Sequence, residues 1–223
     1  MPDPVTAMKA TRMARVFLTR AVPPAAAVLA VPRLRRLDVG LPLTGLVGWT
    51  LCEVLAEHEL ANRAASGSTQ DRRTRHGLVG VHLLSWWAPL AATALRPTRR
   101  SRAALLLGAA MLAGGAAMRI VAVRTLGEFF TAHVRVTDDQ RVCDRGVYAV
   151  VRHPSYTGLF LLNVAPAISV GAWRVAASVA AATAASIGAR VAVEERSLVA
   201  VLGESYREYR ARVPRWLPRP RAF

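Results

Sequence analysis

Five stretches of this 223-residue chain are almost free of charged residues, and their lengths constrain the fold more than any other feature. They have 15 to 21 residues each and cover residues 41–55, 77–95, 103–123, 156–171 and 175–193. An α-helix needs about 20 apolar residues to cross the hydrocarbon core, or roughly 17 when its ends snorkel. The sequence therefore predicts an all-α integral membrane protein with about five transmembrane helices.

A sixth transmembrane helix would follow if residues 14–31 also span the bilayer. The apolar part, 21–31, is short and holds Pro23 and Pro24, so it could instead lie in the interface or lead into the first span. It does not resemble a cleaved signal peptide, because Arg33 follows almost at once and no small-residue cleavage site is clear.

The net charge of +16 at first suggests a nucleic-acid-binding protein, but the basic residues lie between the apolar stretches. Connectors 57–76 and 124–154, with the C-terminal segment, hold the larger share of them, so the positive-inside rule predicts a cytoplasmic C-terminus. The basic run at 96–102 argues against this orientation. Arginine outnumbers lysine 29 to 1, which is typical of a GC-rich bacterial genome and indicates a bacterial plasma membrane. We expect the lipid bilayer as partner, and no nucleic acid.

No pattern in the sequence predicts a metal centre. Cys52 and Cys143 have no nearby cysteine or histidine at a metal-ligand spacing. There is also no HExxH motif, P-loop, nucleophile elbow or dinucleotide fingerprint. The small residues of "GAAMLAGGAAM", at 108–118, predict close packing between helices.

The composition changes once, near residue 124. Residues 1–123 form apolar helices with basic connectors, whereas residues 124–223 hold a polar loop, a helical hairpin and a polar tail. We expect one integrated domain with the chemistry in its second part. Within the polar loop, 131–136 and 140–148 are predicted as short extended pieces, with Gly146 as a turn residue.

The stretch "GVYAVVRHPSYTGLF", at 146–160, places polar residues directly before an apolar segment. Pro154 suits the first position of a helix, and it favours an extended backbone at His153. The first-turn N–H groups of such a helix are unpaired and attract anions. The sequence thus indicates an anion site at Arg152, His153 and the helix start, or else an interfacial cap in which arginine meets lipid phosphate.

A second polar cluster, "GARVAVEERSL" at 188–198, follows the last apolar segment. Arg190 and Glu194 are four residues apart and share a helix face. A turn at 171–174 makes the last two apolar segments a helical hairpin, which brings Tyr156 and Arg190 to the same membrane face. The tail then carries an apolar stripe, which predicts an amphipathic helix over the site or on the lipid surface: Leu198, Leu202, Tyr206, Tyr209 and Val213.

"GVYAVVRHPSYTG", followed about 40 residues later by "RVAVEERSLVAVLGESYREYRARVPRWLP", resembles the isoprenylcysteine carboxyl methyltransferase family, related to phospholipid methyltransferases. The resemblance covers roughly residues 124–218. It implies a multispanning helical enzyme that uses S-adenosylmethionine, bound in a cytoplasmic C-terminal region, to methylate lipophilic acceptors. It implies Arg190 and Glu194 as catalytic residues, with Arg190 binding the acceptor. The implied cofactor-binding residues are Arg135 (or His133 at that place), Gln140, Arg141, Val142, Cys143, Tyr148, His153, Pro154, Ser155, Tyr156 and Glu194.

Methyl transfer is an in-line displacement that requires mainly proximity and alignment, and no metal. A carboxylate acceptor, expected on an isoprenoid or lipid-like molecule, needs only a cation such as Arg190. An amine, thiol or phenol would instead need a base, for which His133 or Glu195 are candidates.

Two other classes of protein remain open. Membrane sterol-type reductases, which use NADPH, share a similar His-Pro-x-Tyr-x-Gly region but commonly carry Asn and an acidic residue where this chain has Ser155 and Leu159. A non-enzymatic membrane protein would bind no cofactor. The two adjacent glutamates and the tail pattern favour methyl transfer over both.

Overall fold

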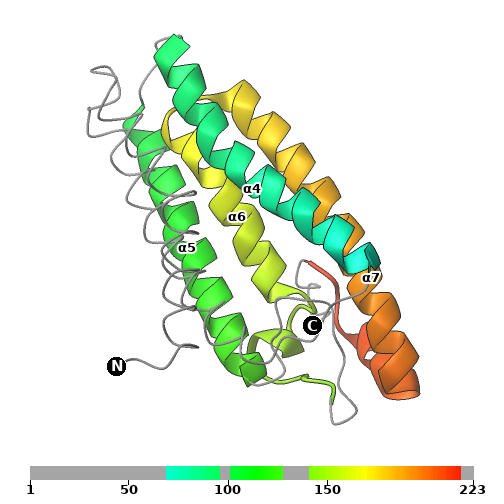
Figure 1. The fold of residues 1–223 in the computed structure, drawn as a ribbon. Helices are drawn as coiled ribbons and strands as arrows, with labels where there is room; N and C mark the ends of the chain where they lie inside the picture. Colours follow the sequence, from blue (N-terminus) through cyan, green and yellow to red (C-terminus); the bar gives the residue numbers. More distant parts are fainter. Residues whose placement is uncertain (1–68, 96–100, 128–140, 217–223) are drawn as a thin grey trace, which may run out of the picture. The chain divides into compact units, whose positions relative to one another are not determined.

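The computed structural model describes residues 69–95, 101–127 and 141–216, and these residues are mostly helical (Figure 1). They form α4 (Thr69–Leu95), α5 (Arg102–Leu126), the 3₁₀-helix η3 (Gly146–Ala149), α6 (Pro154–Ser169) and α7 (Trp173–Arg212). No strand occurs within these described ranges. The predicted helical class is confirmed for this part of the chain, whereas the apolar segments 21–31 and 41–55 lie outside the described residues.

Among the described helices, α5 and α7 are long and apolar enough to cross a membrane, judged by length and composition. The surface of α5 is consistent with a lipid environment, because large apolar side chains such as Leu106 and Ile120 remain exposed on it. The other two predicted apolar segments, 77–95 and 156–171, fall on α4 and α6.

The chain divides into two compact units, and every predicted site residue that the structure describes belongs to the second. The described residues of the first unit are 82–95, 101–110 and 164–179. Those of the second unit are 69–81, 111–127, 141–163 and 180–216.

The first unit contains the turn between α6 and α7. Gly171 has a φ of 71°, which glycine adopts without steric cost, and its N–H donates to the carbonyl of Ile168 (2.9 Å). The N–H of Ala172 donates to the carbonyl of Ala167 (2.9 Å), and α7 begins at Trp173. The predicted helical hairpin is therefore confirmed.

In the second unit, α5 and α6 cross in close contact through two glycines. A Cβ atom added at Gly158 would lie 2.6 Å from the carbonyl oxygen of Gly115, so no larger residue fits without movement of the backbone. This crossing brings Arg119 next to the start of α6, where its Nη1 donates to Ser155 Oγ (2.8 Å). The small-residue helix at 108–118 thus packs closely, as predicted.

The tail also belongs to the second unit, and α7 is kinked within it. Gly203 has φ 58° and ψ −128°, a conformation that interrupts the helix. Beyond the kink, the predicted stripe is confirmed, because Tyr206, Tyr209 and Val213 form a buried apolar cluster. The half-buried side chains that pack against this cluster are Val142, Leu198, Val199 and Leu202.

The segment before α6 differs in part from its prediction. Residues 131–136 lie outside the described part of the chain. The second extended piece, predicted for 140–148, is wrong at its end, because Gly146–Ala149 forms a 3₁₀-helix in which Tyr148 is buried. Gly146 is a turn residue as predicted, with a φ of 56°.

Candidate functional site

The helix α6 begins at Pro154, as the sequence predicts, and the carbonyl of His153 caps its first turn. This carbonyl accepts hydrogen bonds from the N–H groups of Tyr156 and Thr157 (3.1 Å each) and from Thr157 Oγ1 (3.3 Å). Two of the N–H groups at the helix start are therefore already bonded within the protein.

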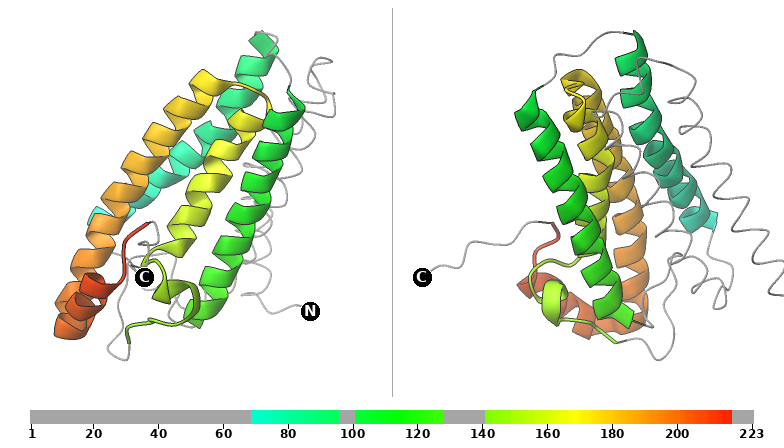
Figure 2. Two further views of the ribbon diagram at one scale, coloured as in Figure 1. Left: turned by 180° about the vertical axis from the view of Figure 1, so that it is seen from behind. Right: turned by 90° about the vertical axis from the view of Figure 1, so that its left-hand side faces the viewer.

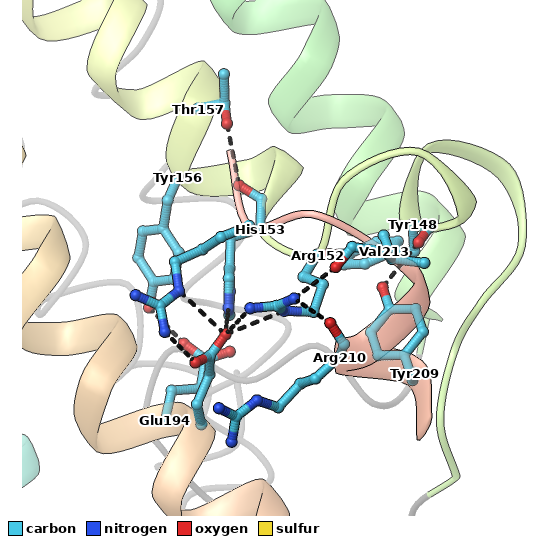
Figure 3. Close-up of polar contacts among 11 residues, drawn as sticks. Tyr148, Arg152, His153, Tyr156, Thr157, Glu194, Tyr209, Arg210 and Val213 are labelled. Atoms are coloured by element: carbon cyan, nitrogen blue, oxygen red, sulfur yellow. Dashed lines mark hydrogen bonds and ion pairs between the residues drawn. The ribbon is translucent and has the colours of Figure 1, made fainter. Parts of the chain in front are cut away.

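The anion that Arg152 binds is a carboxylate of the same chain. Its guanidinium donates to Glu195 Oε1 through Nε (3.1 Å) and Nη2 (3.0 Å). Its Nη1 donates to the carbonyls of Arg210 and Val213 in the tail (Figure 3). The expected anion site at Arg152 and His153 is therefore corrected to an internal ion-pair network, because residue 195 reaches this position once the hairpin folds.

Glu195 is the centre of this network. Its residue is only 4% exposed, and Oε1 lies 3.1 Å from His153 Nε2 while Oε2 accepts from Arg215 Nη2 (2.5 Å). Burial alone would raise the pKa of Glu195, but hydrogen bonds from His153, Arg215 and Arg152 outweigh it and hold the pKa well below its ordinary value. A carboxylate held in this way is unsuited to the role of general base.

A second polar array links α6, α7 and α4. Tyr156 Oη donates to Glu194 Oε2 (2.9 Å) and accepts from Arg190 Nε (3.0 Å). Arg190 Nη1 also donates to Thr74 Oγ1 (3.4 Å), and Arg190 is only 4% exposed. The predicted convergence of Tyr156 with Arg190 and Glu194 is confirmed, with the tyrosine hydroxyl between the two charged side chains. We refer to Tyr156, Arg190 and Glu194 as the tyrosine-bridged array.

The other predicted residues of this region lie in the segment that also contains Tyr156, residues 152–156, which we call the RHPSY segment after its sequence. The ring of His153 lies 5.9 Å from that of Tyr156, Pro154 is fully buried, and Ser155 accepts the hydrogen bond from Arg119. Burial raises the pKa of the Tyr148 phenol, and the nearby charge of Glu194 raises it further, so Tyr148 stays neutral.

The described loop residues that were predicted to bind the cofactor have other surroundings. Arg141 is exposed, Val142 packs on the tail cluster, and Cys143 Sγ lies 3.9 Å from the carbonyl oxygen of Thr125. Arg135 and Gln140, as well as the alternative His133, lie outside the described residues.

Sequence reasoning missed several contributors to the site. A charged residue in an apolar segment is costly, so Arg119 could have been recognised as a candidate. Thr74 and Arg215 carry no comparable signal, because each is an ordinary polar residue in a polar connector. Trp216, whose ring lies 5.7 Å from that of His153, had only the appearance of an interface anchor.

Part of the chain matches the model of a known protein family. The model of the isoprenylcysteine carboxyl methyltransferase (ICMT) family matches residues 106–200. This range includes the RHPSY segment and both glutamates, Glu194 and Glu195.

Curated relatives resemble part of the chain. Protein-S-isoprenylcysteine O-methyltransferase B of Arabidopsis thaliana is 30% identical over 124 residues, which is 50% of this chain and 57% of the relative. Methanethiol S-methyltransferase of Crocosphaera subtropica is 42% identical over 71 residues, 32% of this chain and 27% of the relative. The chain thus spans about half the length of these relatives, or less.

A solved structure of the eukaryotic intramembrane Ras methyltransferase ICMT resembles this chain in fold. The TM-score is 0.63 at 21% sequence identity, and the match covers 95% of this chain and 75% of that one. This similarity concerns the fold alone.

Proposed function

We propose that this chain is a methyltransferase of the isoprenylcysteine carboxyl methyltransferase family, and that it transfers a methyl group from S-adenosylmethionine to a lipophilic acceptor at the membrane interface. The acceptor group we propose is the carboxylate of an isoprenoid or lipid-like molecule. The observation that carries this proposal is the tyrosine-bridged array, because it combines a carboxylate and a two-pronged cation beside the RHPSY segment.

The residues present suit a cationic cofactor. Glu194 is a half-buried carboxylate that accepts a hydrogen bond from Tyr156, and such a group favours a positively charged partner. S-adenosylmethionine supplies a methyl group on a positively charged sulfur when bound. We propose that Glu194 holds its positive charge, within a site completed by Arg135, Gln140, Arg141, Val142, Cys143, Tyr148, His153, Pro154, Ser155 and Tyr156.

Arg190 is the residue we assign to the acceptor. Its guanidinium is a planar, permanently charged donor suited to a carboxylate, and Tyr156 and Thr74 orient it by hydrogen bonds. A carboxylate acceptor is already ionised at neutral pH, so the protein has no proton to remove. Its task is to hold acceptor and donor in line, which by itself lowers the barrier substantially.

The membrane arrangement extends the same proposal. We propose five spans, or six with residues 14–31, in a bacterial plasma membrane with a cytoplasmic C-terminus. Residues 1–123 supply N-terminal helices, and residues 124–223 form the catalytic region of one integrated domain. The basic connectors at 57–76 and 124–154 support this orientation.

A small thiol is the second candidate acceptor. It is favoured by the 42% identity to a methanethiol S-methyltransferase. A thiol must lose its proton before it attacks, and Glu195 is unsuited to accept that proton because three cationic or hydrogen-bonding side chains already occupy it. Another base would then be required.

The first experiment measures binding of S-adenosylmethionine and of NADPH to the detergent-purified protein. We expect binding of S-adenosylmethionine only, and Glu194→Ala should weaken it by about 1–3 kcal/mol, the cost of an unpaired partner. NADPH binding alone would indicate a reductase, and binding of neither ligand would favour a non-enzymatic membrane protein.

The second experiment identifies the acceptor class. Transfer of a labelled methyl group is measured with a prenylated cysteine, a long-chain carboxylic acid and a small thiol. Base-labile label in the extracted lipid indicates an ester, as we propose, whereas label in a thioether indicates the thiol alternative.

A further inference from the structure

The two adjacent glutamates of α7 occupy different environments. Glu194 is half-buried, and Tyr156 donates to its Oε2. Glu195 is buried and accepts from Arg152, His153 and Arg215, which occupy both of its oxygens. A buried carboxylate with this set of partners has little capacity left for a ligand, so its function differs from the one proposed for Glu194.

The partners of Glu195 come from two segments that are distant in sequence. Arg152 and His153 precede α6, whereas Arg215 belongs to the tail segment, which we define as residues 213–216. Glu195 itself lies on α7, so its single carboxylate joins three parts of the second unit.

The backbone also joins the tail segment to the start of α6. The N–H of Arg152 donates to the carbonyl of Pro214 (2.9 Å), and that of His153 donates to the carbonyl of Arg215 (3.3 Å). The ring of Trp216 lies 5.7 Å from that of His153. In both views of Figure 2 the red tail segment runs back from the end of α7. The position of His153 is therefore coupled to the seating of this segment.

The three side chains on Glu195 differ in exposure. The side chains of Arg152 and His153 are 8% and 4% exposed, whereas that of Arg215 is 41% exposed. Loss of Arg152 would remove its buried bonds to Glu195 and to two carbonyls of the tail at once, and would disturb folding. Arg215 can instead be changed with less damage, so it isolates the link between the tail segment and Glu195.

We propose that Glu195 and Arg215 are positioning residues, which seat the tail segment on His153 and thereby set the affinity for the cofactor without touching it. The effect on cofactor affinity rests on the proposed function, whereas the seating of the tail segment does not. The same contacts explain why a tail beyond the last apolar segment is part of the site.

The test compares Arg215→Ala and Arg215→Lys with a matched control, Arg212→Ala. Arg212 is an exposed arginine of the same tail, 3.8 Å from Asp144 and outside the network. Hydrogen exchange at the amides of Arg152 and His153 reports seating of the tail segment, and equilibrium binding of S-adenosylmethionine reports affinity. Glu195→Gln is a second variant that removes the charge and keeps the shape.

In Arg215→Ala we expect exchange at both amides to rise about tenfold and affinity to fall about five- to tenfold. Arg215→Lys should recover part of both losses, since it restores the charge but not the two-pronged geometry. The KM for S-adenosylmethionine should rise while kcat at saturating cofactor changes little. Arg212→Ala should behave as the parent protein.

Two results would overturn the inference. Unchanged exchange in Arg215→Ala and Glu195→Gln would show that these residues do not seat the tail segment. Faster exchange with unchanged affinity would show that seating does not affect the cofactor site. If the parent protein binds no S-adenosylmethionine, the proposed function and the affinity effect fail together, and the exchange data still decide the seating.

Discussion

The hydroxyl of Tyr156 lies between two charged side chains, and Tyr156→Phe removes it with almost no change in shape. The hydroxyl donates to Glu194 (2.9 Å) and accepts from Arg190 (3.0 Å). A hydrogen bond to a charged group contributes about 1.5–3 kcal/mol. Loss of both would cost twice that amount if nothing compensated.

Partial compensation is expected, because Arg190 and Glu194 are four residues apart on α7 and can approach each other when the hydroxyl is absent. We therefore expect a net loss of about 1.5–3 kcal/mol, which corresponds to about a 10- to 150-fold weaker affinity for S-adenosylmethionine. A direct ion pair between Arg190 and Glu194 would also move Arg190 away from the acceptor, so kcat should fall as well.

The assay combines equilibrium binding of S-adenosylmethionine with single-turnover methyl transfer, measured on Tyr156→Phe and on Tyr206→Phe. Tyr206 is a buried tyrosine of the tail cluster and serves as the matched control. If Tyr156→Phe binds and turns over like the control, the tyrosine-bridged array does not form part of the site, and the reasoning is refuted.

Three further predictions follow from the same contacts. Arg190→Ala should lose methyl transfer while it keeps most cofactor affinity, and Arg190→Lys should rescue poorly; full turnover in Arg190→Ala would mean that the acceptor is held elsewhere. Gly158→Ala should lower the free energy of unfolding by about 1–3 kcal/mol, because its Cβ would lie 2.6 Å from the carbonyl oxygen of Gly115. Gly114→Ala is the control, since a Cβ there would meet open space. Equal melting temperatures of the two variants would contradict this prediction. The pKa of Glu195 is lower in the folded protein than the value of about 4.3 in the unfolded chain, so its ionised carboxylate stabilises the fold fully above about pH 4.3. This stabilisation is lost progressively as the pH falls below that value. The melting temperature, measured from pH 7 to 3, should therefore drop less steeply in Glu195→Gln than in the parent protein.

Local sequence patterns were sufficient to predict much of the fold. The apolar segments locate α4 to α7, Pro154 marks the start of α6, and Gly171 lies in the turn before α7. These features depend on residues that are close in sequence, whose effects on the backbone are strong and local. The convergence of Tyr156 with Arg190 follows from the hairpin alone, since two helices joined by a short turn must run back along each other.

The extended piece predicted at 140–148 shows where local patterns are insufficient. A positive φ at Gly146 permits several turns, and the sequence does not choose among them. The 3₁₀-helix places the carbonyl of Tyr148 where it accepts a hydrogen bond from Tyr209 Oη (2.7 Å), 61 residues away. The 3₁₀-helix, which the local pattern did not predict, thus makes a hydrogen bond to the folded tail.

The sequence by itself determined which residues would gather at the start of α6, but only the tertiary structure decided how they pair. Arg152 had an external anion as its predicted partner, and it binds Glu195, 43 residues away, because the hairpin brings that carboxylate within reach. Arg215 joins the same carboxylate only because the kink at Gly203 lets the tail turn back. Opposite charges attract without regard to their positions in the chain, so the choice of partner depends on the packing that sets their distances.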